Sequence, residues 1–243
     1  MAFLQWALPR LGRRWAGYRK VRRQVCRRAR QRAAELGLDG FDAYREHLEA
    51  RPDEWAVLDG LMNVTISRFN RDRGVFAFLR DEVLQPGMRV WSGGCASGEE
   101  PYTLALLCDG LDILATDVDP VMLRRAQAAR YPASALRELP DELLAAFTDG
   151  VLDRRYRHVR FALHDVRDDP PPGLFDLVLC RNLVFTYFDE ATQRAILRRL
   201  AGVATALVIG VHEQLPAGQT EFGPWAPQHG AWTAAARSTN PGH

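Results

Sequence analysis

A glycine-rich turn followed by two adjacent glutamates is the segment of this sequence best suited to chemistry. In VWSGGCASGEEPY, an apolar strand pattern leads into Gly93, Gly94 and Gly98, and a helical pattern begins at Glu99 with Pro101 in its first turn. Glycine lets the backbone approach a ligand closely. The spacing matches neither the GxGxxG of dinucleotide enzymes nor a P-loop. The pattern therefore predicts a small-molecule site where a strand meets a helix.

The charge of this turn constrains its ligand. Glu99 and Glu100 would repel a phosphate at the start of the helix, so a ligand with cationic groups and no phosphate fits better. S-adenosylmethionine, which carries an amino group and a sulfonium, meets this requirement. A second interpretation stays open, in which the two glutamates only interact favourably with the positive end of the helix dipole.

A further acidic position follows the next strand pattern, DILAT. Asp117 lies where nucleoside-binding βαβ units carry an acid that accepts the ribose hydroxyls. Asp119 precedes Pro120 and a helical run, so capping of that helix explains it without a ligand. We therefore expect Asp117, and not Asp119, to contact the ribose of a cofactor, although a role in a turn is the alternative.

Strands that alternate with helices must position the glycine turn and Asp117. Such alternation predicts an α/β fold with a doubly wound parallel sheet, and ligands of these sheets bind at the carboxyl ends of the strands. The tail after Pro216 is rich in Gly, Pro and Trp, which favours a closing antiparallel hairpin with fraying after Arg237. The expected strands are 88–91, 112–116, 159–163, 174–180 and 206–211, and the expected helices are 99–110, 120–131 and 190–201.

The N-terminal part has a helical pattern and a strong positive charge. Eleven basic residues lie between Arg10 and Arg32, and the first acidic residue of the chain is Glu35. Apolar residues at Tyr18, Val21 and Val25 predict a helix with a narrow apolar stripe that ends near Gly37. Further helical patterns at 41–50 and 53–62 complete a small helical domain, which we place at residues 1–61.

Composition excludes several classes of protein. The 243 residues are 47% hydrophobic and 26% charged, without an apolar run long enough to span a membrane. Arginines directly follow the short apolar start, which argues against a signal peptide and for a mature N-terminus. The four cysteines show no CxxC pairing, and the six histidines lie in different segments. We expect a cytoplasmic monomer without disulfides or a bound metal.

Four blocks of the sequence together resemble the chemotaxis receptor methyltransferase (CheR) family. They are AELGLDGFDAYREHLE, TISRFNRD, VWSGGCASGEEPYTLAL with LATDVDP, and FDLVLCRNLVFTYFDEATQ. The resemblance covers nearly the whole chain. It implies a Rossmann-like methyltransferase sheet at residues 62–243 behind the N-terminal helical domain, and S-adenosylmethionine as cofactor. It also implies methyl transfer to the carboxylate side chain of a protein, such as a chemoreceptor glutamate.

The resemblance also implies which residues form the site. Arg71 would hold a carboxylate of the cofactor or the acceptor, since guanidinium binds carboxylates bidentately. Tyr187 would place its hydroxyl at the methyl-transfer site, although LVFTYF is one residue longer than the family's spacing and core packing is the alternative. Thr65 stands where the family has asparagine. The implied cofactor contacts are Thr65, Ser67, Arg71, Gly93, Gly98, Glu99, Asp117, Asp165, Val166, Arg181 and Asn182.

The same resemblance suggests an acidic partner. In the family, a basic N-terminal helix docks on the acidic methylation helix of a chemoreceptor, and the segment 19–30 of this chain could do the same. A solvated cationic face, or binding of nucleic acid or an anionic membrane, is the alternative. The segment 148–160, where the family carries a β-subdomain that grips a receptor tail, is short here, which argues against such tethering. The docking arginines would be Arg19, Arg22, Arg23, Arg27 and Arg30.

Three other functions remain open. A nucleic-acid methyltransferase would carry Asn or Asp, then Pro-Pro and an aromatic residue, after the fourth strand, and this signature is missing. A small molecule, or a protein unconnected with chemotaxis, is a second possible acceptor. A non-catalytic binding module is the third possibility, suggested only by Thr65 and by the extra residue near Tyr187.

Overall fold

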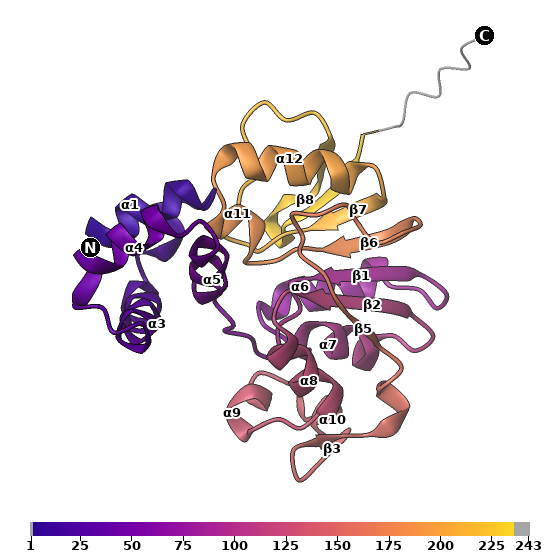
Figure 1. The fold of residues 1–243 in the computed structure, drawn as a ribbon. Helices are drawn as coiled ribbons and strands as arrows, with labels where there is room; N and C mark the ends of the chain where they lie inside the picture. Colours follow the sequence, from indigo (N-terminus) through magenta and orange to yellow (C-terminus); the bar gives the residue numbers. More distant parts are fainter. Residues whose placement is uncertain (1, 236–243) are drawn as a thin grey trace. The chain divides into compact units, whose positions relative to one another are not determined.

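The computed structural model describes residues 2–235, which group into two units (Figure 1). Residues up to Val64 join with Thr186–Thr192 in the first unit, and Thr65–Phe185 joins with the residues from Gln193 onward in the second. The division after Val64 lies beyond the one expected at residues 61 and 62. The segment Thr186–Thr192 also returns to the first unit, which no contiguous division of the sequence describes.

The first unit is helical and has its own apolar core. Phe3, Leu4, Leu48 and Leu58 are all nearly inaccessible to solvent. The buried Arg13 is held by Asp59 at 2.6 Å and by the hydroxyl oxygen of Tyr18 at 2.7 Å. The helices are α1 (Ala2–Arg10), α2 (Trp15–Tyr18), α3 (Arg22–Glu35), α4 (Gly40–Ala50) and α5 (Glu54–Leu61).

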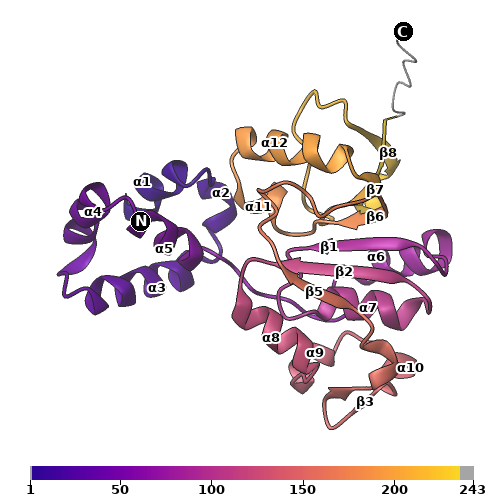
Figure 2. The ribbon, with the colours of Figure 1, turned by 45° about the vertical axis from the view of Figure 1, so that its right-hand side comes forward.

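The second unit is built on one seven-stranded sheet, and its strands β5, β2, β1, β6 and β7 can be followed in Figure 2. Its strands lie in the order β5-β2-β1-β6-β7-β9-β8, parallel except for β9, which is antiparallel to both neighbours. This confirms the doubly wound α/β sheet and its closing hairpin; the expected fraying after Arg237 lies outside the described residues. The strands are β1 (Arg89–Gly93), β2 (Asp112–Asp117), β5 (Arg160–Leu163), β6 (Phe175–Leu179), β7 (Ala204–Val208), β8 (Phe222–Ala226) and β9 (Ala231–Ala234).

Helices connect these strands. None of the described helices is long and apolar enough to cross a membrane. The segment expected to be a shortened β-subdomain folds into the small antiparallel hairpin β3 (Phe147–Thr148) and β4 (Val151–Leu152), followed by the 3-10 turn η2 (Arg154–Tyr156). The remaining elements are α6 (Arg73–Phe78) with the π-helical turn η1 (Leu79–Val83), α7 (Glu99–Leu107), α8 (Pro120–Ala128), α9 (Ala133–Leu136), α10 (Asp141–Leu144), α11 (Val184–Tyr187), α12 (Glu190–Ala201) and the 3-10 turn η3 (Pro227–His229).

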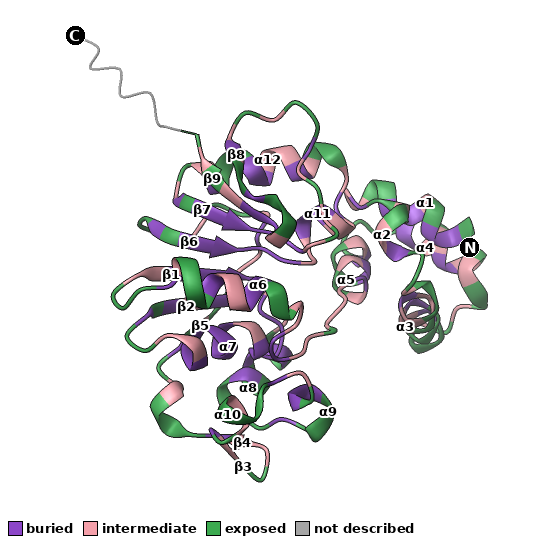
Figure 3. Cartoon of the chain, turned by 180° about the vertical axis from the view of Figure 1, so that it is seen from behind, coloured by how far each residue is buried: buried purple, intermediate pink, exposed green. Residues whose placement is uncertain are grey.

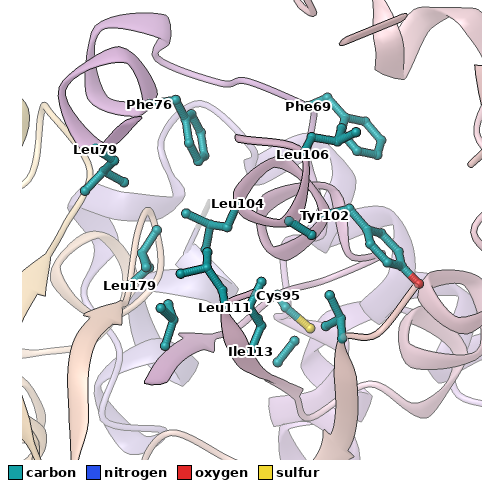
Figure 4. Close-up of a cluster of buried hydrophobic side chains, with 14 of the residues drawn as sticks. Phe69, Phe76, Leu79, Cys95, Tyr102, Leu104, Leu106, Leu111, Ile113 and Leu179 are labelled. Atoms are coloured by element: carbon teal, nitrogen blue, oxygen red, sulfur yellow. The ribbon is translucent and has the colours of Figure 1, made fainter. Parts of the chain in front are cut away.

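The core of the second unit follows the two-residue period of the strands. In β6, Leu177 and Leu179 belong to the main apolar cluster, whereas Val178 between them is buried outside it. The helices α6 and α7 supply the other side of this cluster, and Figure 3 shows them over one face of the sheet. Figure 4 shows Phe76 and Leu104 within the cluster. Each such buried side chain stabilises the fold by roughly 1.5–3 kcal/mol.

Candidate active site

The order of the strands reverses between β1 and β6, and the glycine-rich turn lies at this point. The strand β1 pairs in parallel with β2 on one side and with β6 on the other, so the carboxyl ends of all three meet at one edge. The backbone N–H groups of Gly94 and Cys95 both donate to the carbonyl oxygen of Thr116, at 2.8 and 2.9 Å. Doubly wound sheets bind ligands at such a reversal. The candidate site therefore comprises the segments that follow these strands.

Two glycines of the turn are required by its geometry. Gly94 and Gly98 have φ angles of +79° and +88°. A Cβ on Gly94 would lie 2.4 Å from a methyl carbon of Leu183. A Cβ on Gly98 would lie 2.9 Å from the Cβ of Ala126. The φ angle of Gly93 is not in the left-handed region, and a Cβ there would meet only ordinary contacts, so its role toward the cofactor stays a prediction.

Asp117 is held rigidly at the end of β2. Its side chain accepts hydrogen bonds from the backbone N–H groups of Ala96, at 2.8 Å, and Asp119, at 2.9 Å. Asp117 is only 8% exposed, and burial raises the pKa of its carboxyl group. Asp119 accepts the N–H groups of Val121 and Met122 at the start of α8, which confirms its capping role. The contact of Asp117 with the ribose of a cofactor stays a prediction.

Glu99 is a second buried carboxylate beside the turn. It is 5% exposed, and the hydroxyl of Ser97 donates to its two oxygens at 2.9 and 3.0 Å. Burial raises the pKa of the Glu99 carboxyl group, and Ser67 lines the same cavity as Glu99. The fold therefore brings Ser67 and Glu99 together, although 32 positions separate them in the sequence.

A cavity of about 310 Å³ opens over Glu99, and we call it the Glu99 cavity. Over the described residues, its lining includes Thr65 and Ser67 but not Arg71. A guanidinium nitrogen of Arg71 instead donates to the carbonyl oxygen of Ile66 at 3.3 Å. The lining consists of Thr65, Ile66, Ser67, Arg68, Ser97, Glu99, Arg125, Arg130, Tyr131, Pro132, Ser134, Ala135 and Arg137.

Arg181 is buried and forms two ion pairs within the second unit. Its guanidinium pairs with Asp72 at 2.7 Å and with Glu100 at 3.1 Å, and it also donates to the carbonyl oxygen of Arg71 at 3.0 Å. These contacts tie the end of β6 to the segment before α6 and to the start of α7. The pairing of Arg181 with Asp72 has no signal in the sequence, because 109 positions separate the two residues. A contact of Arg181 with the cofactor stays a prediction.

Asn182 and Glu213 form a second link at the same edge. Asn182 has a φ angle of +55°, and its N–H donates to a carboxylate oxygen of Glu213 at 2.7 Å. The N–H of Gly210 donates to the same oxygen at 2.7 Å. Glu213 therefore joins the segments after β6 and β7, a role that the sequence analysis did not assign to it. The available signal was its position in IGVHEQLP, the segment directly after β7.

The segment after β5 lies next to Asp117. The N–H of His164 donates to the carbonyl oxygen of Asp117 at 3.1 Å, which places Asp165 and Val166 at the same edge of the sheet. Asp165 pairs with Arg167 at 2.6 Å, and Val166 is 8% exposed. Their expected place beside an adenine ring stays a prediction.

Tyr187 belongs to the first unit, unlike the other residues expected to form the site. Its ring centroid lies 5.0 Å from that of Tyr18. The neighbouring Phe188 is buried and lies under the guanidinium of Arg13 at 4.9 Å. Its backbone carbonyl oxygen accepts the N–H of Arg14 at 2.9 Å. The role of Tyr187 in methyl transfer stays a prediction.

The residues at this edge suit S-adenosylmethionine. Asp117 offers carboxylate oxygens for ribose hydroxyls, and Glu99 offers a buried negative charge for an amino group. A raised carboxyl pKa reports a burial cost that a cationic ligand offsets on binding. Among the described residues there is no group of three or more His, Cys, Asp or Glu side chains that could hold a metal ion.

Comparison with known proteins shows the family of this chain. Residues 65–229 match the family described as CheR methyltransferase, SAM binding domain. A chemotaxis protein methyltransferase of Listeria monocytogenes is 33% identical over 202 residues, which cover 72% of this chain and 75% of that protein. An uncharacterized 104.1 kDa protein of Rhodobacter capsulatus is 32% identical over 237 residues, which cover 86% of this chain but only 25% of that protein.

Magnesium protoporphyrin IX methyltransferase from Synechocystis PCC 6803 with bound SAH aligns over 56% of this chain and 52% of that chain, with 22% identity and a TM-score of 0.39. The family match and the Listeria relative, together with the fold and the buried carboxylates, identify the cofactor as S-adenosylmethionine. The chain belongs to the CheR family of S-adenosylmethionine-dependent methyltransferases.

Proposed function

We propose that this protein methylates glutamate side chains in an acidic segment of another protein, such as a chemoreceptor. The support from relatives is that proteins about a third identical to this chain, from Listeria and Salmonella, are named chemotaxis protein methyltransferases. The observation that carries the proposal is the basic face of the first unit, because a cationic surface attracts an acidic substrate.

This basic face lies on α3 and the turn before it. Five arginines there are exposed, and among the described residues none of them forms an ion pair with a carboxylate. The buried side of the same helix carries Val25, Ala29 and Ala33. Charge of one sign over a helix face attracts an oppositely charged partner and speeds its association. The five residues are Arg19, Arg22, Arg23, Arg27 and Arg30, as expected from the sequence.

Methyl transfer to a glutamate side chain requires no acid–base catalysis by the protein. A glutamate side chain with a pKa near 4.3 is ionised at neutral pH, so the acceptor needs no general base. S-adenosylmethionine supplies the methyl group, whose bond to sulfur breaks as the bond to the carboxylate oxygen forms. The protein must orient the acceptor oxygen in line with that methyl and exclude water from it. Asp117 and Glu99 are the residues that would hold the cofactor in place for this step.

Mild alkali separates the possible reactions. The purified protein is incubated with radiolabelled S-adenosylmethionine and either cell extract or a glutamate-rich peptide. Label that alkali releases as volatile methanol comes from a carboxyl ester, and this is the expected result. Label that resists alkali would indicate methylation of nitrogen and would refute the proposal. Methanol that comes only from small molecules in the extract would instead support the alternative acceptor class.

Charge variants test the role of α3. The double variant Arg23→Glu and Arg27→Glu should raise KM for the acidic peptide by about tenfold or more, because the encounter changes from attraction to repulsion. The cofactor affinity should stay unchanged. A matched control is Arg124→Glu with Arg198→Glu, which alters two exposed arginines of the second unit. Equal effects of the two double variants would show that only net charge matters.

A further inference from the structure

The crossover from β5 to β6 is an irregular loop, residues 164–174. The strand order β5-β2-β1-β6 makes this loop pass two strands without the hydrogen bonds that a helix would supply to its own backbone. Side chains supply some of these bonds instead. Four carbonyl oxygens of the loop accept side-chain hydrogen bonds, those of Arg167 and Asp169 at 2.9 Å, Pro172 at 3.0 Å and Leu174 at 3.2 Å. The shape of the loop therefore depends on these donors.

His164 is the donor that lies within the loop itself. Arg199 of α12 and Arg89 of β1 supply three of the four bonds, and Nε2 of His164 supplies the bond to the carbonyl oxygen of Asp169. A carbonyl oxygen can only accept, so Nε2 carries the hydrogen. Nδ1 of the same ring is buried and has no hydrogen-bond partner among residues 2–235. The ring therefore holds the loop through Nε2 alone.

The bond from His164 spans the turn that carries two residues expected at the cofactor. This turn is closed by the N–H of Asp168, which donates to the carbonyl oxygen of Asp165 at 2.9 Å. Before the turn, the backbone N–H of His164 donates to the carbonyl oxygen of Asp117 at 3.1 Å, and its ring donates to the first carbonyl after the turn. Asp165 and Val166 thus lie in a turn whose two ends are fixed by one residue.

Trp91 fixes the orientation of the His164 ring. The two ring centroids lie 5.6 Å apart at an interplanar angle of 77°, an edge-to-face contact. Trp91 is buried, and its indole N–H donates to the hydroxyl oxygen of Thr116 at 2.9 Å. Thr116 directly precedes Asp117 in β2. The same packing therefore joins the ring to the strand that carries the expected ribose ligand.

We propose that His164 is a positioning residue for the nucleoside part of S-adenosylmethionine. Its ring closes the turn at Asp165 and Val166, the residues expected beside the adenine ring, and holds them in a fixed place relative to Asp117. Without this bond the cofactor itself would have to order the turn, and the cost would lower its affinity. The assignment rests on the identity of the cofactor and on these expected contacts. It concerns no acceptor and so goes beyond the proposed function.

Two substitutions separate the hydrogen bond from the loss of the ring. Glutamine places its amide nitrogen at about the same distance along the side chain as Nε2 of histidine, whereas the amide nitrogen of asparagine ends at the level of Nδ1. His164→Asn should lose the bond to Asp169 and bind S-adenosylhomocysteine about fivefold more weakly, as expected for one hydrogen bond. His164→Gln should stay within about twofold of the wild type. Isothermal titration calorimetry measures both affinities.

A second ligand shows which part of the cofactor the turn holds. Adenosine has the nucleoside of S-adenosylhomocysteine and lacks its amino-acid part. His164→Asn should weaken the binding of both ligands by the same factor. Glu99→Gln should weaken only S-adenosylhomocysteine, because Glu99 is expected to bind the amino group. Adenosine binding is followed by NMR titration. A loss in His164→Asn that is confined to S-adenosylhomocysteine would overturn the assignment.

His158 provides a matched control. It is an exposed histidine whose Nδ1 lies 3.1 Å from the carbonyl oxygen of Arg155. His158→Asn removes a contact of the same kind outside the expected site and should keep both affinities. Unchanged S-adenosylhomocysteine affinity in His164→Asn would refute the role of His164, and so would a His164→Gln variant that binds as weakly as His164→Asn. Urea denaturation checks that every variant is folded.

Turnover assays separate this inference from a catalytic role and from the proposed function. In His164→Asn the KM for S-adenosylmethionine should rise while kcat at saturating cofactor is kept, because the turn binds the nucleoside and not the reacting atoms. A fall in kcat with an unchanged KM would contradict a positioning role. Label that resists alkali in the wild type would refute carboxyl methylation and leave the effect of His164 on cofactor binding intact.

Discussion

A carboxylate oxygen of Glu213 holds the backbone N–H of Asn182. One carboxylate oxygen of Glu213 accepts the N–H groups of Asn182 and Gly210, each at 2.7 Å. Asn182 has a left-handed φ of +55°, a conformation that few residues other than glycine adopt without cost. The carboxylate therefore stabilises a turn at the edge of the sheet where the cofactor site lies.

Removal of this carboxylate should weaken both the fold and the site. Glu213→Ala leaves two partly buried N–H groups without their acceptor, which should lower the free energy of unfolding by about 1–3 kcal/mol. Glu213→Gln keeps one acceptor oxygen and should have a smaller effect. Urea denaturation and calorimetry with S-adenosylhomocysteine measure stability and affinity. Glu142→Ala, an exposed glutamate of α10, is the control and should change neither quantity.

The affinity for S-adenosylmethionine should depend on pH through Glu99. Burial raises the pKa of this carboxyl group, so it becomes protonated at a higher pH than an ordinary glutamate as the solution is acidified. Protonation removes the charge that attracts the cofactor's amino group, and affinity should fall by up to about tenfold per pH unit below that pKa. The Glu99→Gln variant should bind S-adenosylmethionine weakly, and its affinity should lack this dependence on pH. An identical pH profile of the variant and the wild type would exclude Glu99 as the source of the pH dependence.

The raised pKa of Glu99 has the opposite effect on the stability of the protein without cofactor, which should increase on acidification. A raised carboxyl pKa means that the folded state binds the proton more tightly than the unfolded state. The contribution of Glu99 to stability should therefore increase as the pH falls from the folded-state pKa toward the ordinary value near 4.3. The difference in free energy of unfolding between wild type and Glu99→Gln, measured across this range, isolates that contribution.

Two glycines with the same φ angle separate backbone strain from steric contact. Gly87 and Gly98 both have φ at +88°, but a Cβ on Gly87 would meet nothing within 4 Å, whereas one on Gly98 would lie 2.9 Å from the Cβ of Ala126. Gly87→Ala should cost about 1–2 kcal/mol from the left-handed backbone alone. Gly98→Ala should cost about 1–3 kcal/mol more, from overpacking. If urea denaturation showed the same loss of free energy of unfolding for both variants, the turn at Gly98 would relax freely around the added methyl group.

The buried ion pairs of Arg181 should contribute far more to the free energy of unfolding than an exposed ion pair of similar length. The Arg181 side chain is 2% exposed and lies 2.7 Å from Asp72, whereas Arg160 and Asp112, also at 2.7 Å, are 57% and 49% exposed. Arg181→Met should lower the free energy of unfolding by about 3 kcal/mol, because it leaves partly buried carboxylates unpaired. Arg160→Met should cost less than about 1 kcal/mol. Thermal and urea unfolding of both variants compare the two pairs.

The sequence by itself determined the class of fold and the local features of the site. The period of the apolar residues predicted the strands and most helices of the second unit, because burial on a sheet imposes that period on the chain. The roles of Asp119 as a cap and of Gly98 before α7 follow from residue type and immediate neighbours. The family motifs predicted S-adenosylmethionine as the cofactor.

Only the tertiary structure decided which distant groups meet. No pattern joins Arg181 to Asp72, Ser67 to Glu99 or Asn182 to Glu213, because pairing across the sheet edge depends on the strand order and not on spacing along the chain. The same holds for Tyr187: its motif suggested methyl transfer, whereas the fold places it in the first unit, where its ring contacts that of Tyr18. The cationic character of the Glu99 cavity also arises in this way, since its arginines come from separate segments and gather only in the folded unit.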